Sequence, residues 1–378
     1  MKRTVSGIIV LGGHVQALGI IRILGRLGYR IVVIDNTNIN ISRHSKYCHR
    51  HYVIKDAKLL SFLLAKRGKY INWAILPTGD YHVKILSKYK DSLEQSYFVC
   101  QDSWDKVEKF YNKKFTYTLA SQLDIPIPKT YTVSDISQLE KHTEFPCIIK
   151  PSIRHTFYHQ VKKKVFICNN QNELRHKYRR TCNIIPADEI LIQSIIVGDN
   201  SNQYSVCGFY IEGKPIAQLT ACRYRQHPIN FGYATTYAET TEKPQLEEYA
   251  GRIIRAVKYT GICEIEFKYD SRDKQYKLLE VNPRTWKWHV ISQLANIPFL
   301  ELYLKYLNKE DVKPLQSISC ASYRHLLTDL PMQFMSLLKG YKHWNRRNKP
   351  LAAAVWAKDD PLPALFQFLY LGYFIISR

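Results

Sequence analysis

The strongest constraint on the fold is a strand–helix–strand pattern in residues 6–35. The sequence is SGIIVLGGHVQALGIIRILGRLGYRIVVID, with apolar runs at 8–11 and 29–35. Between them, apolar side chains recur at helical spacing: Leu18, Ile21, Leu24 and Leu27. Strands joined by a helix pair in parallel, because parallel neighbours need a long crossover. We therefore predict a parallel sheet, continued by WAILPTGD (73–80) and SYFVC (96–100).

The glycine turn between the first strand and its helix, GGHVQALG, does not fit a dinucleotide fingerprint. Gly-x-Gly-x-x-Gly requires glycine at the third position, where this chain has His14. A NAD site is therefore disfavoured, although Asp35 stands where a ribose ligand would lie. Such glycines are often only structural. A helix N-terminus still attracts anions, so a substrate carboxylate could bind there.

The pattern changes after about residue 145 to β-rich segments separated by polar turns. The expected strands are FPCIIKPS, KKVFICN, EILIQSIIVGD, YSVCGFYIEGKPIAQLTACRY, GICEIEFKYD and YKLLEVNP. One helix is expected before them, at 103–125, and one among them, at 241–260. The fold class is therefore α/β followed by α+β with mainly antiparallel strands. We expect domain edges near residues 100, 190 and 310.

The chain is strongly basic, with 55 Lys and Arg against 32 Asp and Glu and a net charge of +23. This balance favours anionic partners such as nucleotides, nucleic acid, acidic glycans or a membrane surface. A merely solvated basic surface is an equally good interpretation. No specific nucleic-acid partner is expected, because only the net charge would support one.

Cysteine usage and the ends of the chain bear on its location. Nine cysteines, with no Cys-x-x-Cys pair, indicate free thiols in a reducing compartment. The first residues lack the pattern of a signal peptide, so we expect a cytoplasmic protein, and a position at the inner membrane surface stays open as an alternative. The segment 339–350, KGYKHWNRRNKP, is basic and aromatic, and 361–378 is apolar but too short to span a bilayer. Packing on the body is favoured over membrane contact for this tail.

A row of polar side chains follows an apolar strand at 278–284. Glu280, Asn282 and Arg284 alternate, so they share one face of the strand. If this strand pairs with GICEIEFKYD as a hairpin, Glu266 and Glu280 converge beside Asn282. Two carboxylates and an amide oxygen suit Mg²⁺ or Mn²⁺, and the arginine could brace a transferring phosphoryl group. The alternative is a solvent-facing strand edge with paired charges.

Two lysines upstream favour the first interpretation. Lys150 ends the apolar run CIIK, and Lys164 opens KVFI. A lysine at a strand end can act as a point charge on nucleotide phosphates. ILIQSII then offers a strand whose backbone could bind an adenine edge. Singly these are ordinary residues, but in this order they indicate a nucleotide site between two β lobes.

The order of these motifs resembles the ATP-grasp superfamily, within it the carboxylate–amine ligase-like proteins of the D-aspartate ligase and carbamoyl phosphate synthetase large-chain type. The resemblance covers residues 5 to about 305 and rests on motifs such as FYNKKFTYTLASQLDIPIPKTY, IIKPS, ILIQSIIVGD and VNPR. It implies a Rossmann-like pre-ATP-grasp domain (1–100), an N-terminal ATP-grasp lobe (101–190) and a C-terminal lobe with the metal site (191–310). Residues 311–378 are then a C-terminal extension.

The resemblance also implies roles for individual residues, with ATP and Mg²⁺ or Mn²⁺ as the bound groups. Phosphate binding is implied for Lys113, Lys150, Lys164 and Arg223. Adenine and ribose contacts are implied for Gln193, Ser194, Ile196 and Gln203. Metal ligation is implied for Glu266, Glu280 and Asn282, and stabilisation of the transferring group for Arg284. Lys287 and Trp288 are bulkier than the residues usual in this group, where the segment helps to line the acceptor pocket.

The implied reaction joins a small-molecule carboxylate to an amine. ATP phosphorylates the carboxylate, because an acyl phosphate has a better leaving group, and the amine then forms an amide. Two alternatives stay open: a nucleotide-binding protein without ligase turnover, and a membrane-surface or cell-envelope component that acts through its C-terminal tail. The sequence does not identify the carboxylate, the amine or the oligomeric state.

Overall fold

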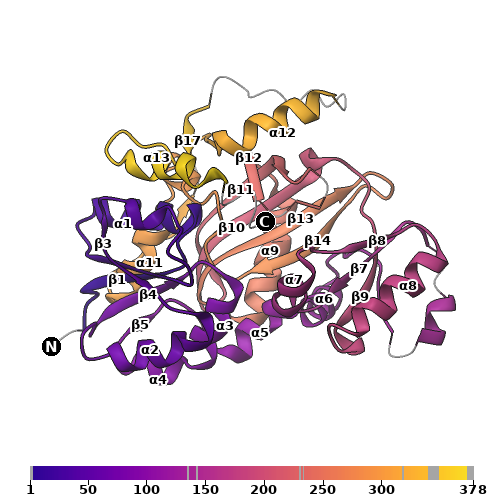
Figure 1. Cartoon of the computed structure of the whole chain (residues 1–378), viewed down its shortest axis with the longest axis horizontal. Coiled ribbons are helices and arrows are strands. Elements are labelled where there is room, and N and C mark those ends of the chain that lie inside the picture. The colour runs from indigo at the N-terminus through magenta and orange to yellow at the C-terminus, as the bar shows by residue number, and fades with distance from the viewer. Residues whose placement is uncertain are drawn as a thin grey trace.

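Three sheets organise the part of the chain that the structure describes. The structure is a computed structural model, and it describes residues 3–133, 136–141, 144–229, 231–232, 234–316, 319–338 and 349–372. A five-stranded sheet at one end and a four-stranded sheet at the other flank a large eight-stranded sheet (Figure 1). The expected mixture of an α/β part and an α+β part is therefore confirmed.

The five-stranded sheet is parallel, as predicted, with the order β3-β2-β1-β4-β5. Its strands are β1 Gly7–Leu11, β2 Ile31–Asp35, β3 Cys48–Val53, β4 Trp73–Pro77 and β5 Phe98–Val99. Its helices are α1 Val15–Arg26, α2 Leu59–Lys66, α3 Asp80–Lys88 and α4 Lys90–Glu94. The glycine turn leads into α1, and a Cβ atom at Gly13 would overlap the side chains of Asp35 and Asn40. This glycine is therefore needed for packing.

The single helix predicted at 103–125 is wrong. The structure has two helices, α5 Trp104–Tyr111 and α6 Lys113–Gln122. Between them Asn112 has an extended backbone, and its side-chain oxygen accepts a hydrogen bond of 3.0 Å from the amide of Lys114. Asparagine is a good helix N-cap, so the helical pattern restarts here. The restart makes Lys113 the first residue of α6.

The four-stranded sheet has the order β6-β9-β7-β8 and is antiparallel throughout. Its strands are β6 Thr130–Thr132, β7 Cys147–Pro151, β8 Phe166–Cys168 and β9 Ile190–Ser194, with helices α7 Arg154–Val161 and α8 Gln171–Cys182. The domain edge expected near residue 190 falls at the start of β9. Because β9 pairs with both β6 and β7, the small sheet extends to Ser194.

The eight-stranded sheet runs β14-β13-β10-β11-β12-β16-β17, and β15 pairs with β11. Its strands are β10 Gln203–Ile211, β11 Lys214–His227, β12 Ala234–Thr241, β13 Gly261–Asp270, β14 Gln275–Asn282, β15 Leu315–Gln316, β16 Ser322–Arg324 and β17 Leu351–Ala353. The remaining α-helices are α9 Pro244–Val257, α10 Ile291–Leu294, α11 Phe299–Leu307, α12 Leu326–Leu338 and α13 Leu362–Leu369. Short 3₁₀ turns lie at Ser42–His44 (η1), Asp56–Lys58, Ile136–Lys141, Ala187–Glu189 and Asn200–Asn202 (η5).

Residues after 310 are not a separate extension, in contrast to the expectation. β15, β16 and β17 belong to the large sheet, and α13 packs on the parallel-sheet domain. There the rings of Phe366 and His44 stack with centroids 3.4 Å apart, and the buried Arg22 and Asp360 form an ion pair of 2.9 Å. Packing is thus confirmed for the described part of the tail. Residues 339–348 and 373–378 of the predicted basic and apolar tail lie outside the described residues.

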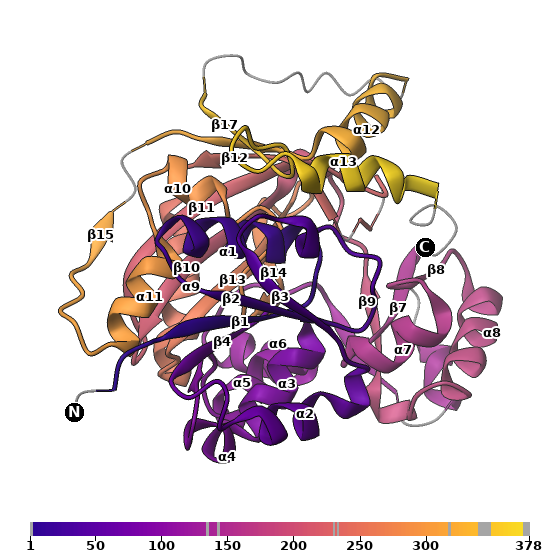
Figure 2. The same ribbon diagram turned by 60° about the vertical axis from the view of Figure 1, so that its left-hand side comes forward.

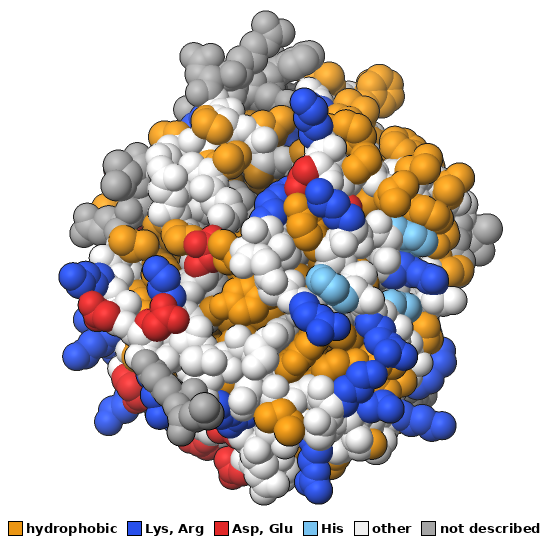
Figure 3. Space-filling view, turned by 90° about the vertical axis from the view of Figure 1, so that its left-hand side faces the viewer, with side chains coloured by type: hydrophobic (Ala, Val, Ile, Leu, Met, Phe, Trp, Pro, Cys, Tyr) orange, Lys and Arg blue, Asp and Glu red, His pale blue; other side chains and the backbone are white. Residues whose placement is uncertain are grey.

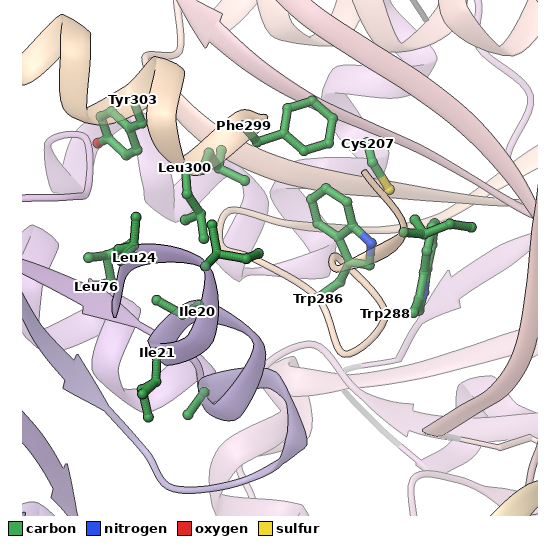
Figure 4. Close-up of a cluster of buried hydrophobic side chains, with 14 of the residues drawn as sticks. Ile20, Ile21, Leu24, Leu76, Cys207, Trp286, Trp288, Phe299, Leu300 and Tyr303 are labelled. Carbon is green, nitrogen blue, oxygen red and sulfur yellow. The ribbon is translucent and has the colours of Figure 1, made fainter. Parts of the chain in front are cut away.

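One hydrophobic cluster joins the parallel-sheet domain to the large sheet (Figure 4). Ile20 and Leu24 of α1 face Leu300 and Tyr303 of α11, and Trp286 packs edge-on against Phe299. Because this core is shared, the parallel-sheet domain is held in a fixed place beside the β13–β14 hairpin. Among the described residues, no helix is long and apolar enough to cross a membrane.

The turn that closes the β13–β14 hairpin depends on a buried carboxylate, that of Asp270. It accepts hydrogen bonds from Arg272 at 2.7 and 3.0 Å and from Lys277 at 3.0 Å. The Arg272 hydrogen bonds, with Lys277, hold the pKa of Asp270 well below its usual range. A depressed pKa contributes stability that is fully present above the unfolded-state pKa of about 4 and is lost progressively as the pH falls from there through the lower folded-state pKa.

We therefore expect Asp270→Asn to lower the free energy of unfolding by about 2 kcal/mol at pH 7, and by less at pH 3, where part of the contribution is already lost. Urea denaturation at both pH values measures the difference. The exposed Asp311, changed to Asn, is the matched control and should be neutral. A loss of equal size at both pH values would contradict the assigned role.

Candidate active site

The predicted row of ligands lies on a real hairpin. β13 and β14 pair antiparallel, with Glu266 opposite Glu280 and Glu264 opposite Asn282. The Asn282 amide nitrogen donates to Glu266 at 3.1 Å and to Glu264 at 3.3 Å. The hairpin therefore brings the predicted carboxylates and amide together. The pairing follows from the short four-residue turn between the two strands.

Cations and donors hold these acidic groups in place. Glu266 accepts from Gln203 at 2.9 Å and from the guanidinium of Arg223, and Glu280 lies 3.2 Å from the ammonium of Lys113. Burial, with Glu266 beside it, raises the pKa of Glu264 to about 8. Negative charge is thus crowded on this face, and added positive charge would stabilise it.

The donor set suits a hard divalent cation bound partly by its substrate. Within the described ranges, no group of three or more His, Cys, Asp and Glu side chains is arranged to hold a metal. Two carboxylates and one amide can instead supply part of a Mg²⁺ shell, with phosphate oxygens and water completing it. Such an ion would bind Glu266 alongside Arg223, and it would bind Glu280 alongside Lys113.

A cavity of about 370 Å³ lies between the four-stranded and eight-stranded sheets. Most of the predicted site residues line it: Lys113, Lys150, Lys164, Gln193, Ser194, Ile196, Gln203, Glu266 and Glu280. The other three predicted residues, Arg223, Asn282 and Arg284, do not line it. Its walls therefore come from both lobes, as the order of motifs indicated.

Three of the four lysines that line this cavity were predicted, and they come from three separate segments of the chain. Lys113 begins α6, Lys150 lies in β7, and Lys164 precedes β8 and donates to the carbonyl of Gly232 at 3.1 Å. Lys150 is buried and donates to the hydroxyl of Tyr117 at 2.5 Å. Burial, reinforced by the nearby charge of Lys113, lowers the pKa of Lys150 to about 7. An anion in the cavity would favour its charged form.

The predicted adenine-binding hinge forms the end of β9. The Gln193 side-chain amide donates to the hydroxyl of Thr130 at 2.7 Å, and the Ser194 backbone amide donates to the carbonyl of Lys129 at 3.0 Å. These bonds fix the hinge to the β6 side of the small sheet. Ile196 follows as a buried apolar side chain on the cavity wall.

Arg284 lies at the junction between the hairpin and the parallel-sheet domain. Its Nε donates to Asp80 at 2.7 Å, and one terminal nitrogen donates to the side-chain oxygen of Asn282 at 3.2 Å. A second, small cavity beside it is lined by Asp80, Tyr111, Lys113, Glu280 and Asn282, among others. Sequence reasoning missed Asp80, whose signal was an acidic residue three positions after the apolar strand WAILP.

Helix α12, which follows the β strands of both lobes up to β16, also contributes to the nucleotide-sized cavity, and sequence reasoning missed this. Ser336 of α12 lines it, as does Arg225 of β11. The guanidinium of Arg225 makes two hydrogen bonds, of 2.7 and 2.9 Å, to the fully buried Asp329 of α12. A single acidic residue in the otherwise uncharged LLTDLPMQFMSLL was the available signal.

The expectation that the segment around Lys287 and Trp288 helps to line an acceptor pocket is wrong for the tryptophan. Trp288 is 1% exposed and packs against Trp286 in the cluster shared with α1 (Figure 4). The bulk of this side chain therefore fills the core. It leaves the cavity between the lobes unobstructed.

Comparison with known proteins agrees with this architecture. The family model described as "Carbamoyl-phosphate synthase L chain, ATP binding domain" matches residues 221–306, from β11 to α11. A D-aspartate ligase of Enterococcus faecium (strain Aus0004) is 26% identical over 237 residues, which is 58% of this chain and 54% of that protein. The chain thus spans about half the length of this curated relative.

Solved structures share the fold at low sequence identity. The L-amino acid ligase from Bacillus licheniformis has a TM-score of 0.64 at 14% identity, covering 85% of this chain and 80% of its own. The biotin carboxylase from Campylobacter jejuni has a TM-score of 0.67 at 14% identity, and the match covers 85% of this chain and 75% of that one. The N5-carboxyaminoimidazole synthetase from Staphylococcus aureus has a TM-score of 0.66 at 14% identity, and the match covers 98% of each chain. The chain is thus similar in fold to these enzymes, and residues 221–306 are similar in sequence to the carbamoyl-phosphate synthase ATP-binding domain.

Proposed function

We propose that the protein is an ATP-dependent carboxylate–amine ligase that forms an amide through an acyl phosphate. The observation that carries the proposal is the convergence of charge on one cavity. Lys113, Lys150 and Lys164 come from three separate segments of the chain, and Glu266 and Glu280 face them from the hairpin. A triphosphate needs several cations, and a phosphoryl transfer site needs carboxylates for its metal. The D-aspartate and L-amino acid ligases among the similar proteins support the same reaction class.

The lysines would bind the phosphates and align the γ-phosphoryl group with the acceptor carboxylate. A carboxylate oxygen attacks the γ-phosphorus and the bond to the β-phosphate oxygen breaks, which gives ADP and an acyl phosphate. The amine nitrogen then attacks the acyl carbon and phosphate leaves with the original carboxylate oxygen. The nitrogen releases its proton, and an amide remains. No covalent enzyme intermediate is needed.

The hairpin residues would divide the remaining work. Glu266, Glu280 and Asn282 would hold Mg²⁺ or Mn²⁺, which when bound offsets charge on the phosphates. Arg223, bonded to Glu266, would fix that ligand and add positive charge beneath the phosphates. Arg284, held by Asp80 next to Asn282, would stabilise charge that develops on the transferring group and on the tetrahedral intermediate. Nine free cysteines support a reducing, cytoplasmic site of action.

The metal assignment predicts that Glu280→Gln weakens ATP binding only when Mg²⁺ is present. We expect a loss of ten- to a hundredfold in MgATP affinity, because one charged ligand is gone, and little change without the metal. Titration calorimetry with and without Mg²⁺ measures both. The exposed Glu242, changed to Gln, serves as control. Equal losses under both conditions would point to the Lys113 ion pair instead of a metal.

The low pKa of Lys150 predicts a pH-dependent affinity. Bound phosphate favours charged lysine, so ATP binding should take up close to one proton near pH 8, and affinity should fall as the pH rises from 6 to 9. Lys150→Arg should flatten this profile, since arginine stays charged. Calorimetry in buffers of different ionisation enthalpy counts the protons. Lys163→Met, at an exposed position, should behave as wild type.

The acyl-phosphate route predicts the fate of one oxygen atom. With a substrate acid labelled by ¹⁸O in its carboxylate, one label should appear in the phosphate released with ADP. Mass spectrometry of the phosphate shows it, and unlabelled acid in ¹⁸O water is the control. Binding of ATP without ADP formation across a panel of acids and amines would instead support the nucleotide-binding alternative.

A further inference from the structure

Helices α12 and α13 have the reverse of the usual surface-helix pattern. α12 buries Asp329 and Ser336, while Phe334 is 63% exposed and Leu338 is 73% exposed. α13 buries Gln367 and leaves Phe368 62% exposed. A surface helix of a soluble protein normally buries its apolar stripe and exposes polar residues. Here most of the buried side chains are polar, Met332 and Pro363 being the exceptions, and most of the apolar side chains face out.

These outward faces carry no charge. The sequences of the two helices are LLTDLPMQFMSLL and LPALFQFL, and their single charged residue is the buried Asp329, paired with Arg225 and Arg324. Exposed apolar side chains of these helices also include Leu326, Leu330, Met335, Leu337, Leu362, Leu365 and Leu369. An exposed apolar surface of this extent marks a contact with a membrane or another protein.

The two helices lie on the same side of the molecule. Both views place them at the top, and a 2.8 Å hydrogen bond joins Gln367 of α13 to His325 at the start of α12 (Figures 1 and 2). Trp356, 64% exposed, precedes α13 on this side of the chain. Hydrophobic side chains gather along the upper right of the face drawn in Figure 3, and Lys and Arg side chains gather below them. We call the exposed side chains of α12, α13 and Trp356 the apolar face.

The surroundings of the apolar face are basic. The stacking of Phe366 on His44 places η1 beside α13, and the neighbouring Lys46 is exposed, as is Lys358 just before α13. The nearby acids are already engaged: Asp359 pairs with Arg26, and Asp360 is buried. A second copy of a chain with charge +23 would be repelled from this face, whereas an anionic surface would be attracted.

We propose that the apolar face docks on the surface of an anionic lipid bilayer. α12 and α13 have 13 and 8 residues and so are about 20 and 12 Å long, too short to span a hydrocarbon core of about 30 Å. They would lie in the interface, with phenylalanine and leucine among the acyl chains and Trp356 at headgroup depth. The basic side chains beside them would meet anionic headgroups.

Vesicle flotation of the full-length protein tests this proposal. We expect binding to vesicles of phosphatidylcholine with phosphatidylglycerol, weaker binding to pure phosphatidylcholine, and loss of the difference at high salt. The double change Phe334→Glu and Phe368→Glu should reduce binding by about tenfold or more, since both aromatic rings would leave the interface. ATP titration of the variant verifies that it is folded.

Ile71→Glu is the matched control, because Ile71 is an equally exposed apolar residue on the parallel-sheet domain. It should bind vesicles as the wild type does. The proposal is overturned if the wild-type protein does not bind anionic vesicles, or if the double variant binds them as strongly as the wild type. Analytical ultracentrifugation tests the other occupant of this face. If the wild type self-associates but does not bind vesicles, and the double variant does not self-associate, the apolar face is a contact between copies of the chain.

Discussion

The candidate site depends on a balance between buried carboxylates and the cations that face them. Glu264 and Glu266 are buried side by side on β13, an arrangement that desolvation and mutual repulsion oppose. Arg223 and Gln203 bind Glu266, and Lys113 reaches Glu280 from another element. The large sheet and α6 are thus fixed to one another by charge as well as by packing. A nucleotide with its metal would enter a cavity in which the carboxylates and the cations are already held in position.

Sequence patterns were informative wherever the structure is local. The βαβ unit and the β13–β14 hairpin followed from periodicity and short turns, so the positions of Glu266, Glu280 and Asn282 could be predicted. Asn112 shows the limit of periodicity, because one capping side chain divides an otherwise continuous helical pattern. The residue at which a helix begins or ends depends on single capping hydrogen bonds, and hydrophobic periodicity does not detect them.

Long-range partners could not be predicted from pattern. Arg284 meets Asp80 across 204 residues of sequence, and Arg225 meets Asp329 across 104. Neither pair shares a strand or helix face, so no periodicity connects its members. The same reason applies to Trp288. Its bulk suggested an obstructed pocket, whereas the side chain packs in the core that is shared with α1. Such placements follow from the packing of whole elements on one another.

The contribution of α12 to the cavity wall has a consequence for the order of events during synthesis. Lining residues extend from Lys113 to Ser336, so a nascent chain that has emerged only as far as β14 has most of the strands of both lobes but not the complete wall. Until Asp329 is made, Arg225 is without its acidic partner on α12. A ligand stabilises only the state of a protein that binds it. A nucleotide that needed the complete wall would therefore not assist early folding of the lobes, which must rely on their own cores.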